Sequence, residues 1–170
     1  GRKIETDLTT GNGVSKPYGV VTASSLGKTT AGATAITFEE IMDLKQALPK
    51  AYRDGGAYMF HDDVLHYVRK LKDSQNQYLW QPSLQIGVPD TLLGKPVYTD
   101  PFVAAPALSA KSVIFGDMSQ FWVRQVNGIE VVRSDEAYFT TGQIAWRASI
   151  RIDSALGNSS AVKYFKGGTA

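Results

Sequence analysis

The chain has 170 residues, which is enough for one sizeable hydrophobic core or two small ones. It is 43% apolar and 20% charged, as folded proteins are, and its net charge is only +2. Because binding to nucleic acid needs a concentrated basic face, this balance argues against a DNA-binding role. The absence of cysteine excludes disulfides and thiolate metal sites, and no apolar run approaches the ~20 residues that span a membrane.

The first 35 residues are short of large apolar side chains. Residues 1–19 are rich in turn formers, and the small-residue stretch at 24–35 predicts an exposed loop or linker. A helix is predicted to begin after Thr37, whose hydroxyl can cap it while Glu40, three residues on, reaches back to the Thr37 N–H. Pro49 predicts that this helix ends near Leu48, or that a new turn begins there with Pro49 as its first residue. The chain begins without methionine, so we expect a processed product or a fragment.

The stretch from Ala57 to Leu79 predicts a strand followed by a helix. Residues 58–60 are a short apolar run typical of a buried strand, and Asp62 or Asp63 can cap the helix that follows. The apolar residues of this helix recur at spacings that place them on one face: Val64, Leu65, Val68 and Leu71.

The later part of the chain predicts mostly strands. Residues 112–116 form an apolar strand candidate, and Asn127–Gly128, between two apolar arms, predicts a tight hairpin over 123–132. Residues 143–153 alternate strictly, which predicts a long strand with one buried and one solvated face. The side chains on the predicted buried face are Ile144, Trp146, Ala148, Ile150 and Ile152. Helices early in the chain and antiparallel strands late favour an α+β fold.

One cluster of side chains could hold a metal or perform acid–base chemistry. Asp62 and His66 lie four apart on the predicted helix, a spacing that metal sites use, but no third ligand motif accompanies them. A carboxylate at a strand-to-helix junction is also what helix capping requires. We therefore predict no catalytic residue, metal or cofactor, and keep a small metal-dependent hydrolase as a rival hypothesis. The cluster consists of His61, Asp62, Asp63 and His66.

A group of bulky residues follows the polar exit of this helix. Tyrosine and tryptophan in such a segment are common anchors at protein–protein contacts, so we predict a self-association surface here. The alternative is that these aromatic side chains fold back onto their own domain. The candidate contacts are Tyr78, Leu79, Trp80, Gln81 and Pro82.

Several short motifs follow one another along nearly the whole chain. The first motifs are Thr9–Gly13, Lys16–Val20, Leu48–Pro49, Tyr52–Arg53 and the strand at 58–60. The most telling motifs are Leu71–Asp73, Tyr78–Pro82 and Leu93–Val97. The series ends with Phe115–Asp117 and the strand at 147–153. In this order the motifs resemble the major capsid protein family of tailed bacteriophages, which has the Hong Kong 97 fold.

The resemblance implies a fold and a division into domains. The expected fold is α+β, with a mixed sheet flanked by helices and long antiparallel strands. Residues 1–35 would be a peripheral-domain segment and linker, and residues 36–122 the axial domain, whose loop at 75–89 would point towards the capsomer axis. Residues 123–155 would form a peripheral hairpin and long strand, and residues 156–170 a return strand to the axial domain and a tail.

The resemblance also implies a structural, non-enzymatic function. Such a protein assembles with copies of itself, as pentamers and hexamers, into an icosahedral shell around double-stranded DNA that it encloses without sequence-specific binding. Scaffold, portal or decoration proteins would be further partners, and no membrane is involved. The location would be the virion, after assembly in the cytoplasm of the bacterial host.

Members of this family usually carry an arm, an extended loop and a spine helix upstream of the segments matched here. The chain therefore resembles the carboxy-terminal portion of a capsid subunit, and we expect it to be a monomer or small oligomer in dilute solution. A rival with the same fold is the encapsulin-type nanocompartment shell, which encloses enzymes rather than DNA.

Overall fold

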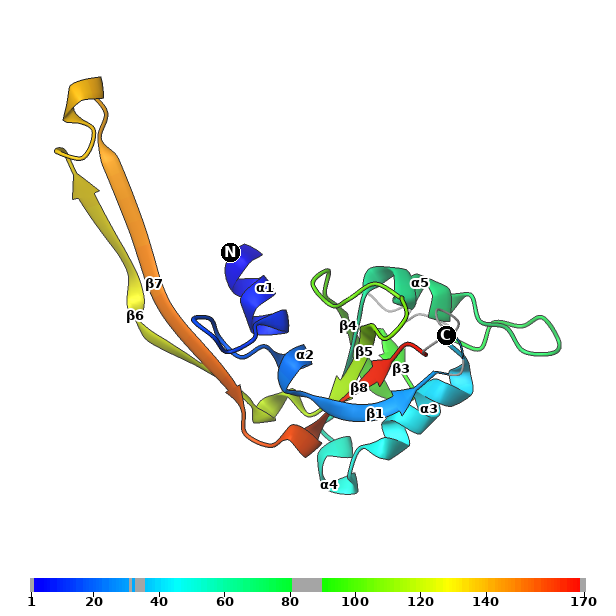
Figure 1. Cartoon of the computed structure of the whole chain (residues 1–170). Helices are drawn as coiled ribbons and strands as arrows, with labels where there is room; N and C mark the ends of the chain where they lie inside the picture. The colour runs from blue at the N-terminus through cyan, green and yellow to red at the C-terminus, as the bar shows by residue number, and fades with distance from the viewer. Residues whose placement is uncertain (1, 31, 33–35, 81–89, 169–170) are drawn as a thin grey trace.

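The computed structural model describes residues 2–30, 32, 36–80 and 90–168. Within these residues the chain forms two parts: a mixed sheet with helices packed on it, and a two-stranded ribbon that projects far from the sheet (Figure 1). Helices and long antiparallel strands therefore occur together, as the α+β prediction required.

The described part of the mixed sheet has the strand order β1-β8-β5-β2-β4-β3. Its central strands are antiparallel, whereas β1 runs parallel to β8 and β2 runs parallel to β4. The strands predicted at 58–60 and 112–116 are confirmed as neighbours, with Tyr58 opposite Phe115. The bounds are Ser25–Thr29 for β1, Ala57–Phe60 for β2, Thr91–Leu92 for β3, Lys95–Thr99 for β4, Lys111–Gly116 for β5 and Val162–Lys166 for β8.

The predicted capping box opens α3 (Phe38–Ala47). The Glu40 N–H donates to Thr37 Oγ1 at 3.2 Å, and the Thr37 N–H donates to Glu40 Oε2 at 2.9 Å, so two backbone donors at the helix start are satisfied. The helix ends before Leu48, as predicted, and Pro49 precedes the short helix α4 (Lys50–Arg53).

The helix predicted after residue 60 is α5 (Asp62–Arg69), but its cap differs from the prediction. His61, not an aspartate, is the N-cap residue: its ring Nδ1 accepts the Asp63 N–H at 3.2 Å. Asp62 and Asp63 occupy the first turn, where their charges favour the positive end of the helix dipole.

Two apolar clusters enclose the sheet. The larger one joins α3 and α5 to one face of the sheet and contains Ile41, Leu44, Tyr58, Phe60, Val64, Val68, Phe115 and Phe165. Because side chains alternate along a strand, Ile114 points to the opposite face and joins a second cluster with Val20, Val103 and Val162. Burying each large apolar side chain stabilises the fold by roughly 1.5–3 kcal/mol.

Residues 2–30 are more structured than the sequence predicted. Helix α1 (Arg2–Thr10) forms within the stretch predicted to be turns, and α2 (Val20–Ala23) follows it. The predicted linker contains β1, because pairing with β8 overrides its weak strand composition. A Cβ at Gly27 of β1 would lie 2.6 Å from Leu44 Cδ1, so the glycine lets α3 pack closely on this strand.

The predicted hairpin at Asn127–Gly128 is wrong. Strand β6 (Phe121–Ser134) continues past both residues and pairs with β7 (Ala145–Leu156). Asn127 has a φ of 56°, and residues 127–129 form a bulge opposite Ile150. The prediction failed because asparagine and glycine suit a bulge in a strand as well as a turn. The chain reverses at 135–144, through the turn η2 (Phe139–Thr141).

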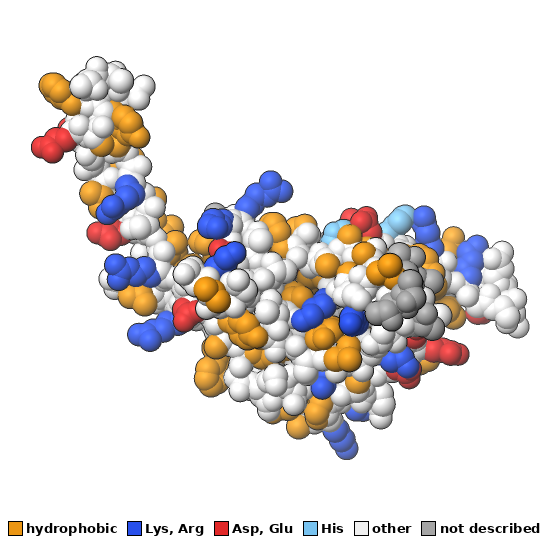
Figure 2. All heavy atoms as spheres, in the orientation of Figure 1, with side chains coloured by type: hydrophobic (Ala, Val, Ile, Leu, Met, Phe, Trp, Pro, Cys, Tyr) orange, Lys and Arg blue, Asp and Glu red, His pale blue; other side chains and the backbone are white. Residues whose placement is uncertain are grey.

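The long strand predicted at 143–153 is confirmed as β7, but its predicted burial is wrong. Trp146 is 66% exposed, and hydrophobic side chains lie open along the ribbon (Figure 2). Within the described residues the outer part of the ribbon has no second layer packed on it. Alternation predicts which side chains share a face, but it does not say what covers that face.

Candidate self-association site

The segment after α5 forms an extended loop at the end of the molecule opposite to the ribbon (Figure 1). Its two arms meet at a bridge between Lys72 and Tyr78. Asp73 organises the tip, because its Oδ1 accepts the N–H groups of Gln75 at 2.8 Å and Gln77 at 2.9 Å. The Asp73 side chain thus closes a tight turn, which makes the loop a compact projection.

Two of the predicted contact residues are accessible on this loop. Tyr78 is 57% exposed, and the ammonium of Lys72 lies 4.9 Å from the centre of its ring. Leu79 is exposed as well, although its N–H donates to the Leu71 carbonyl at 3.0 Å. The loop therefore presents an aromatic and an aliphatic side chain on a hydrogen-bonded backbone, an arrangement suited to a protein contact.

Trp80 lies elsewhere, with only 6% of its surface exposed. Its indole N–H donates to the Thr91 carbonyl at 2.7 Å, and the Arg69 guanidinium lies 5.4 Å from its ring centre. Arg69 also forms an ion pair with Asp90. Trp80 thus folds back onto its own domain, the alternative open at the sequence level, and anchors the loop. Gln81 and Pro82 lie outside the described residues.

The ribbon is a second candidate surface, which the sequence predicted only as a buried face. Pairing of β6 with β7 gives the ribbon a mainly apolar side and a mixed side that holds most of its charges. The apolar side contains Val123, Val131, Trp146, Ile150 and Ile152, with Arg133 opposite Trp146. The charged side contains Arg124, Glu130, Arg147, Arg151 and Asp153, together with Trp122, Val126 and Val132. Strict alternation is the signal that could have identified this amphipathic surface.

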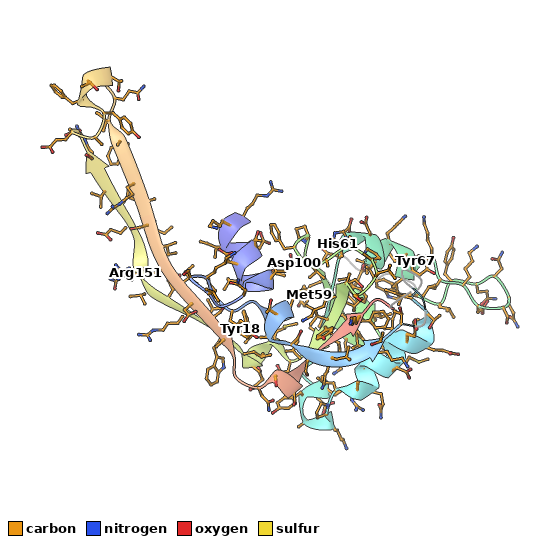
Figure 3. The ribbon with its side chains drawn as sticks, viewed as in Figure 1. Tyr18, Met59, His61, Tyr67, Asp100 and Arg151 are labelled. Carbon is orange, nitrogen blue, oxygen red and sulfur yellow. The ribbon has the colours of Figure 1, made fainter. Side chains whose placement is uncertain are left out.

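An apolar hollow of about 420 Å³ lies where α1 meets the base of the ribbon. Its walls come from five elements, and include two flexible methionine side chains that can adapt to an occupant. The lining residues are Ile4, Glu5, Leu8, Thr9, Val20, Met59, Met118 and Phe121. Figure 3 shows Met59 in this region, between the sheet and the base of the ribbon.

The residues at 61–66, which the sequence left open as a rival metal site, lie at the start of α5. His61 serves as the cap of α5, and within the described residues no group of three or more His, Cys, Asp or Glu side chains could hold a metal ion. Burial raises the pKa of Tyr58 and lowers that of Lys111, but both are packed within the fold. None of the described helices is both long and apolar enough to cross a membrane.

The geometry agrees with comparisons to known proteins. The structure is similar to the capsid of an empty GTA particle, with a TM-score of 0.86 and 25% sequence identity over 99% of this chain. The shared region is 62% of that capsid chain, so the chain spans less than two thirds of this relative. A search of curated proteins finds no significant match.

Two further structures share the fold at lower identity. The structure from Gordonia phage Cozz matches with a TM-score of 0.67 and 12% identity, over 97% of this chain and 58% of that one. The SrpI encapsulin of Synechococcus elongatus matches with a TM-score of 0.69 and 13% identity, over 99% and 61%. A family model described as the phage capsid family matches residues 1–167. The chain therefore belongs to the phage capsid family, with the Hong Kong 97-like fold.

Proposed function

We propose that this chain is the carboxy-terminal portion of a major capsid protein, which assembles with copies of itself into the icosahedral shell of a tailed phage or prophage. The main support is the family match over residues 1–167, together with the close likeness to a capsid chain at 25% identity. The assembled protein would reside in the phage head and enclose double-stranded DNA, after assembly in the host cytoplasm. Its function would be structural and not enzymatic.

The proposed domains follow the two parts of the molecule. The sheet with α3 and α5 corresponds to the axial domain, and the ribbon to the peripheral domain. One proposed boundary changes: β1 lies in the segment that the sequence assigned to the peripheral domain and linker, and it pairs with β8 in the sheet. We therefore assign Ser25–Thr29 to the axial domain as well as residues 36–122 and the return strand.

The loop at 70–80 is the proposed contact around pentamer and hexamer axes. Tyr78 and Leu79 are accessible there, and Asp73 and Trp80 hold the loop in shape from within. Repeated around a closed ring, even a small contact of this kind is multiplied by symmetry. Scaffold, portal or decoration proteins are proposed partners of the completed shell.

The test uses the full-length gene product that contains this chain. Electron microscopy of the purified product should show closed icosahedral shells, and a Tyr78→Ser, Leu79→Ser double variant should yield far fewer of them. Tyr98→Ser, which alters another exposed tyrosine of the same domain, is the matched control and should assemble normally. Failure of the unaltered protein to form shells under any assembly condition would contradict the proposal.

An encapsulin-type compartment is the second candidate, favoured by the fold likeness to SrpI encapsulin. The two functions differ in what the shell contains. Shells from infected or induced cells should hold nuclease-protected DNA if the protein is a phage capsid. A protein cargo without DNA would establish the compartment reading instead.

A further inference from the structure

The bulge of β6 contains the sequence Asn-Gly in an exposed, irregular stretch of backbone. Asn127, Gly128 and Ile129 have no partner residues on β7, although the register is regular from Val126 back to the base and from Glu130 outward. Both Asn127 and Gly128 are exposed to solvent. We propose that Asn127 is a site of spontaneous deamidation, a covalent modification built into the peripheral ribbon.

The chemistry requires only these two residues and water. The Gly128 backbone nitrogen gives its proton to the solvent and attacks Cγ of Asn127; the side-chain nitrogen takes a proton from the solvent, and its bond to Cγ breaks as ammonia leaves. The resulting five-membered succinimide takes up water at either of its carbonyls and opens to aspartate or isoaspartate. Asparagine is thermolabile for this reason, and glycine as the following residue offers the least steric hindrance to the attack.

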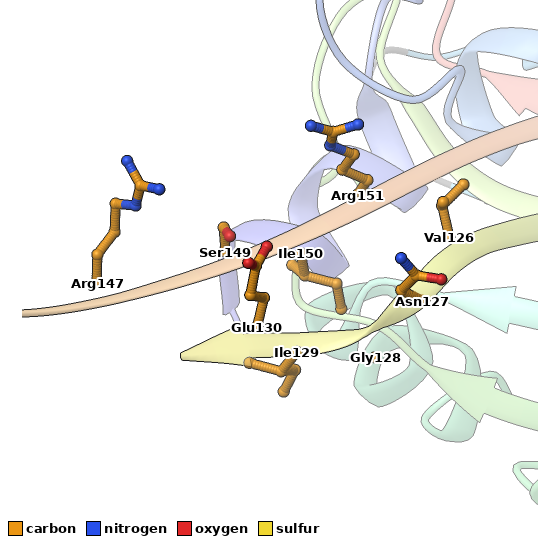
Figure 4. A pocket seen from close by; sticks show the side chains of 9 residues that line it. All are labelled: Val126, Asn127, Gly128, Ile129, Glu130, Arg147, Ser149, Ile150 and Arg151. Atoms are coloured by element: carbon orange, nitrogen blue, oxygen red, sulfur yellow. The ribbon is translucent and has the colours of Figure 1, made fainter. Parts of the chain in front are cut away.

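The surroundings of Asn127 favour this reaction. The bulge lies beside an open hollow of about 660 Å³ whose lining includes Glu130, Arg147 and Arg151. Figure 4 shows these side chains and that of Asn127 rising on one side of the ribbon, with Ile129 and Ile150 on the other. Attack on Cγ places negative charge on the side-chain oxygen, and Arg151, which pairs with Val126 next to Asn127, is the cation positioned to stabilise it.

A second Asn-Gly pair in the same chain provides an internal comparison. Asn12 is also exposed, but its Oδ1 accepts the Val14 N–H at 3.1 Å, and its backbone pairs with Tyr18. A Cβ on Gly13 would lie 3.0 Å from the Tyr18 ring, so this loop is closely packed. Its side chain and backbone must break these contacts before the attack, and Asn12 should therefore react more slowly than Asn127.

Deamidation would change the ribbon in two ways. Residues 121–156 contain four arginines and four carboxylates, so a new carboxylate at 127 turns a neutral ribbon into an acidic one. Isoaspartate also adds a methylene group to the backbone of β6, in the bulge that separates the base of the ribbon from its outer half. Aged and newly made subunits would thus differ in both the charge and the shape of this surface.

The experiment follows both sites in the folded chain at mildly alkaline pH, using peptide mass spectrometry and enzymatic methylation of isoaspartate. Asn127 should gain about 1 Da at least about tenfold faster than Asn12, a difference of ~1.4 kcal/mol in activation free energy. Asn127→Asp marks the position of the product in chromatography. A rate ratio below tenfold, or faster conversion at Asn12, would overturn the proposal.

Two variants test the mechanism. Gly128→Ala fits the structure, since a Cβ there meets nothing within 4 Å, and it should slow conversion at Asn127 by about tenfold with unchanged circular dichroism. Arg151→Gln should slow it by about threefold, the size of an exposed charge interaction. Conversion of Asn127 at the unaltered rate in Gly128→Ala would exclude the succinimide route and with it the proposal.

Discussion

Tyr18 and Ser154 are joined by two hydrogen bonds. The Tyr18 N–H donates to the Ser154 carbonyl at 3.4 Å, and Ser154 Oγ donates to the Tyr18 carbonyl at 3.1 Å. Ser154 is buried, so its end of both bonds is shielded from water, whereas Tyr18 is exposed. They tie the loop after α1 to β7, at the base of the ribbon, and so help to set the direction in which the ribbon leaves the sheet.

Ser154→Ala should destabilise the chain by about 1 kcal/mol, because it removes one of these bonds and leaves the Tyr18 carbonyl with one partner fewer. Chemical denaturation measures the change. Ser149→Ala, at an exposed position of the same strand, is the control and should stay within about 0.5 kcal/mol of the parent. Equal effects from the two variants would show that the Tyr18–Ser154 pair contributes nothing.

Trp80→Ala and Tyr78→Ala should behave differently although the residues are two apart. Trp80 is packed in the core, and its loss should cost about 3–5 kcal/mol in the free energy of unfolding. Tyr78 is exposed, and its replacement should cost less than about 0.5 kcal/mol. Denaturation of both variants measures this contrast, and a Trp80→Ala variant as stable as Tyr78→Ala would contradict the anchoring role of the indole.

The buried hydroxyl of Tyr58 should make the stability of the folded state depend on pH in the alkaline range. Its hydroxyl is buried without a hydrogen-bond partner in the described structure, and burial raises its pKa above the ordinary value of about 10. Below pH ~10 the tyrosine is protonated in both the folded and unfolded states, so it adds no pH dependence there. Above that pH only the unfolded state loses the proton, and stability should fall as pH rises.

The variant Tyr58→Phe should remove this component of the alkaline loss. At neutral pH it should be as stable as the parent or more so, because no hydrogen bond is lost and one unsatisfied polar group is removed. Denaturation midpoints measured across the alkaline range provide the test. A parallel decline in the parent and the variant would mean that Tyr58 titrates normally.

Trp146→Ser should separate folding from assembly. Trp146 is largely exposed on the apolar side of the ribbon, so the isolated chain should lose less than about 0.5 kcal/mol of stability. Shell yield of the full-length product, counted by electron microscopy, should fall, because an apolar surface open in one subunit is suited to burial in the assembly. Arg147→Ser, on the charged side, is the control and should assemble normally.

Local patterns in the sequence predicted the local structure well. The pairing of Thr37 with Glu40 fixed the start of α3, and the apolar run at 58–60 predicted β2 correctly, because capping and strand burial depend on neighbouring residues. The α+β class followed from the order of such segments. Candidate contacts Tyr78 and Leu79 were identified from their polar flanks and are exposed, and their role in self-association stays a proposal.

The errors arose where a distant segment decides the outcome. Residues 25–29 became a strand because β8 lies beside them, and no local signal announces that partner. Asn127–Gly128 suits a turn and a bulge equally, and only the length of the paired strands selects the bulge. For Trp80 the sequence left open both a surface contact and packing on its own domain, because Thr91 and Arg69, which hold it in the core, are eleven residues away on either side.

The pairing of β1 with β8 has a consequence for synthesis of the protein. Strand β8 sits between β1 and β5, and residues 30 and 168 are joined by a hydrogen bond of 2.8 Å from the Gly168 N–H to Thr30 Oγ1. The sheet can therefore be completed only when almost the entire chain has left the ribosome, and such long-range pairing is slow to form. A polypeptide that stopped before Val162 would leave β1 and β5 with unpaired edges on either side of the missing strand, and such edges promote aggregation.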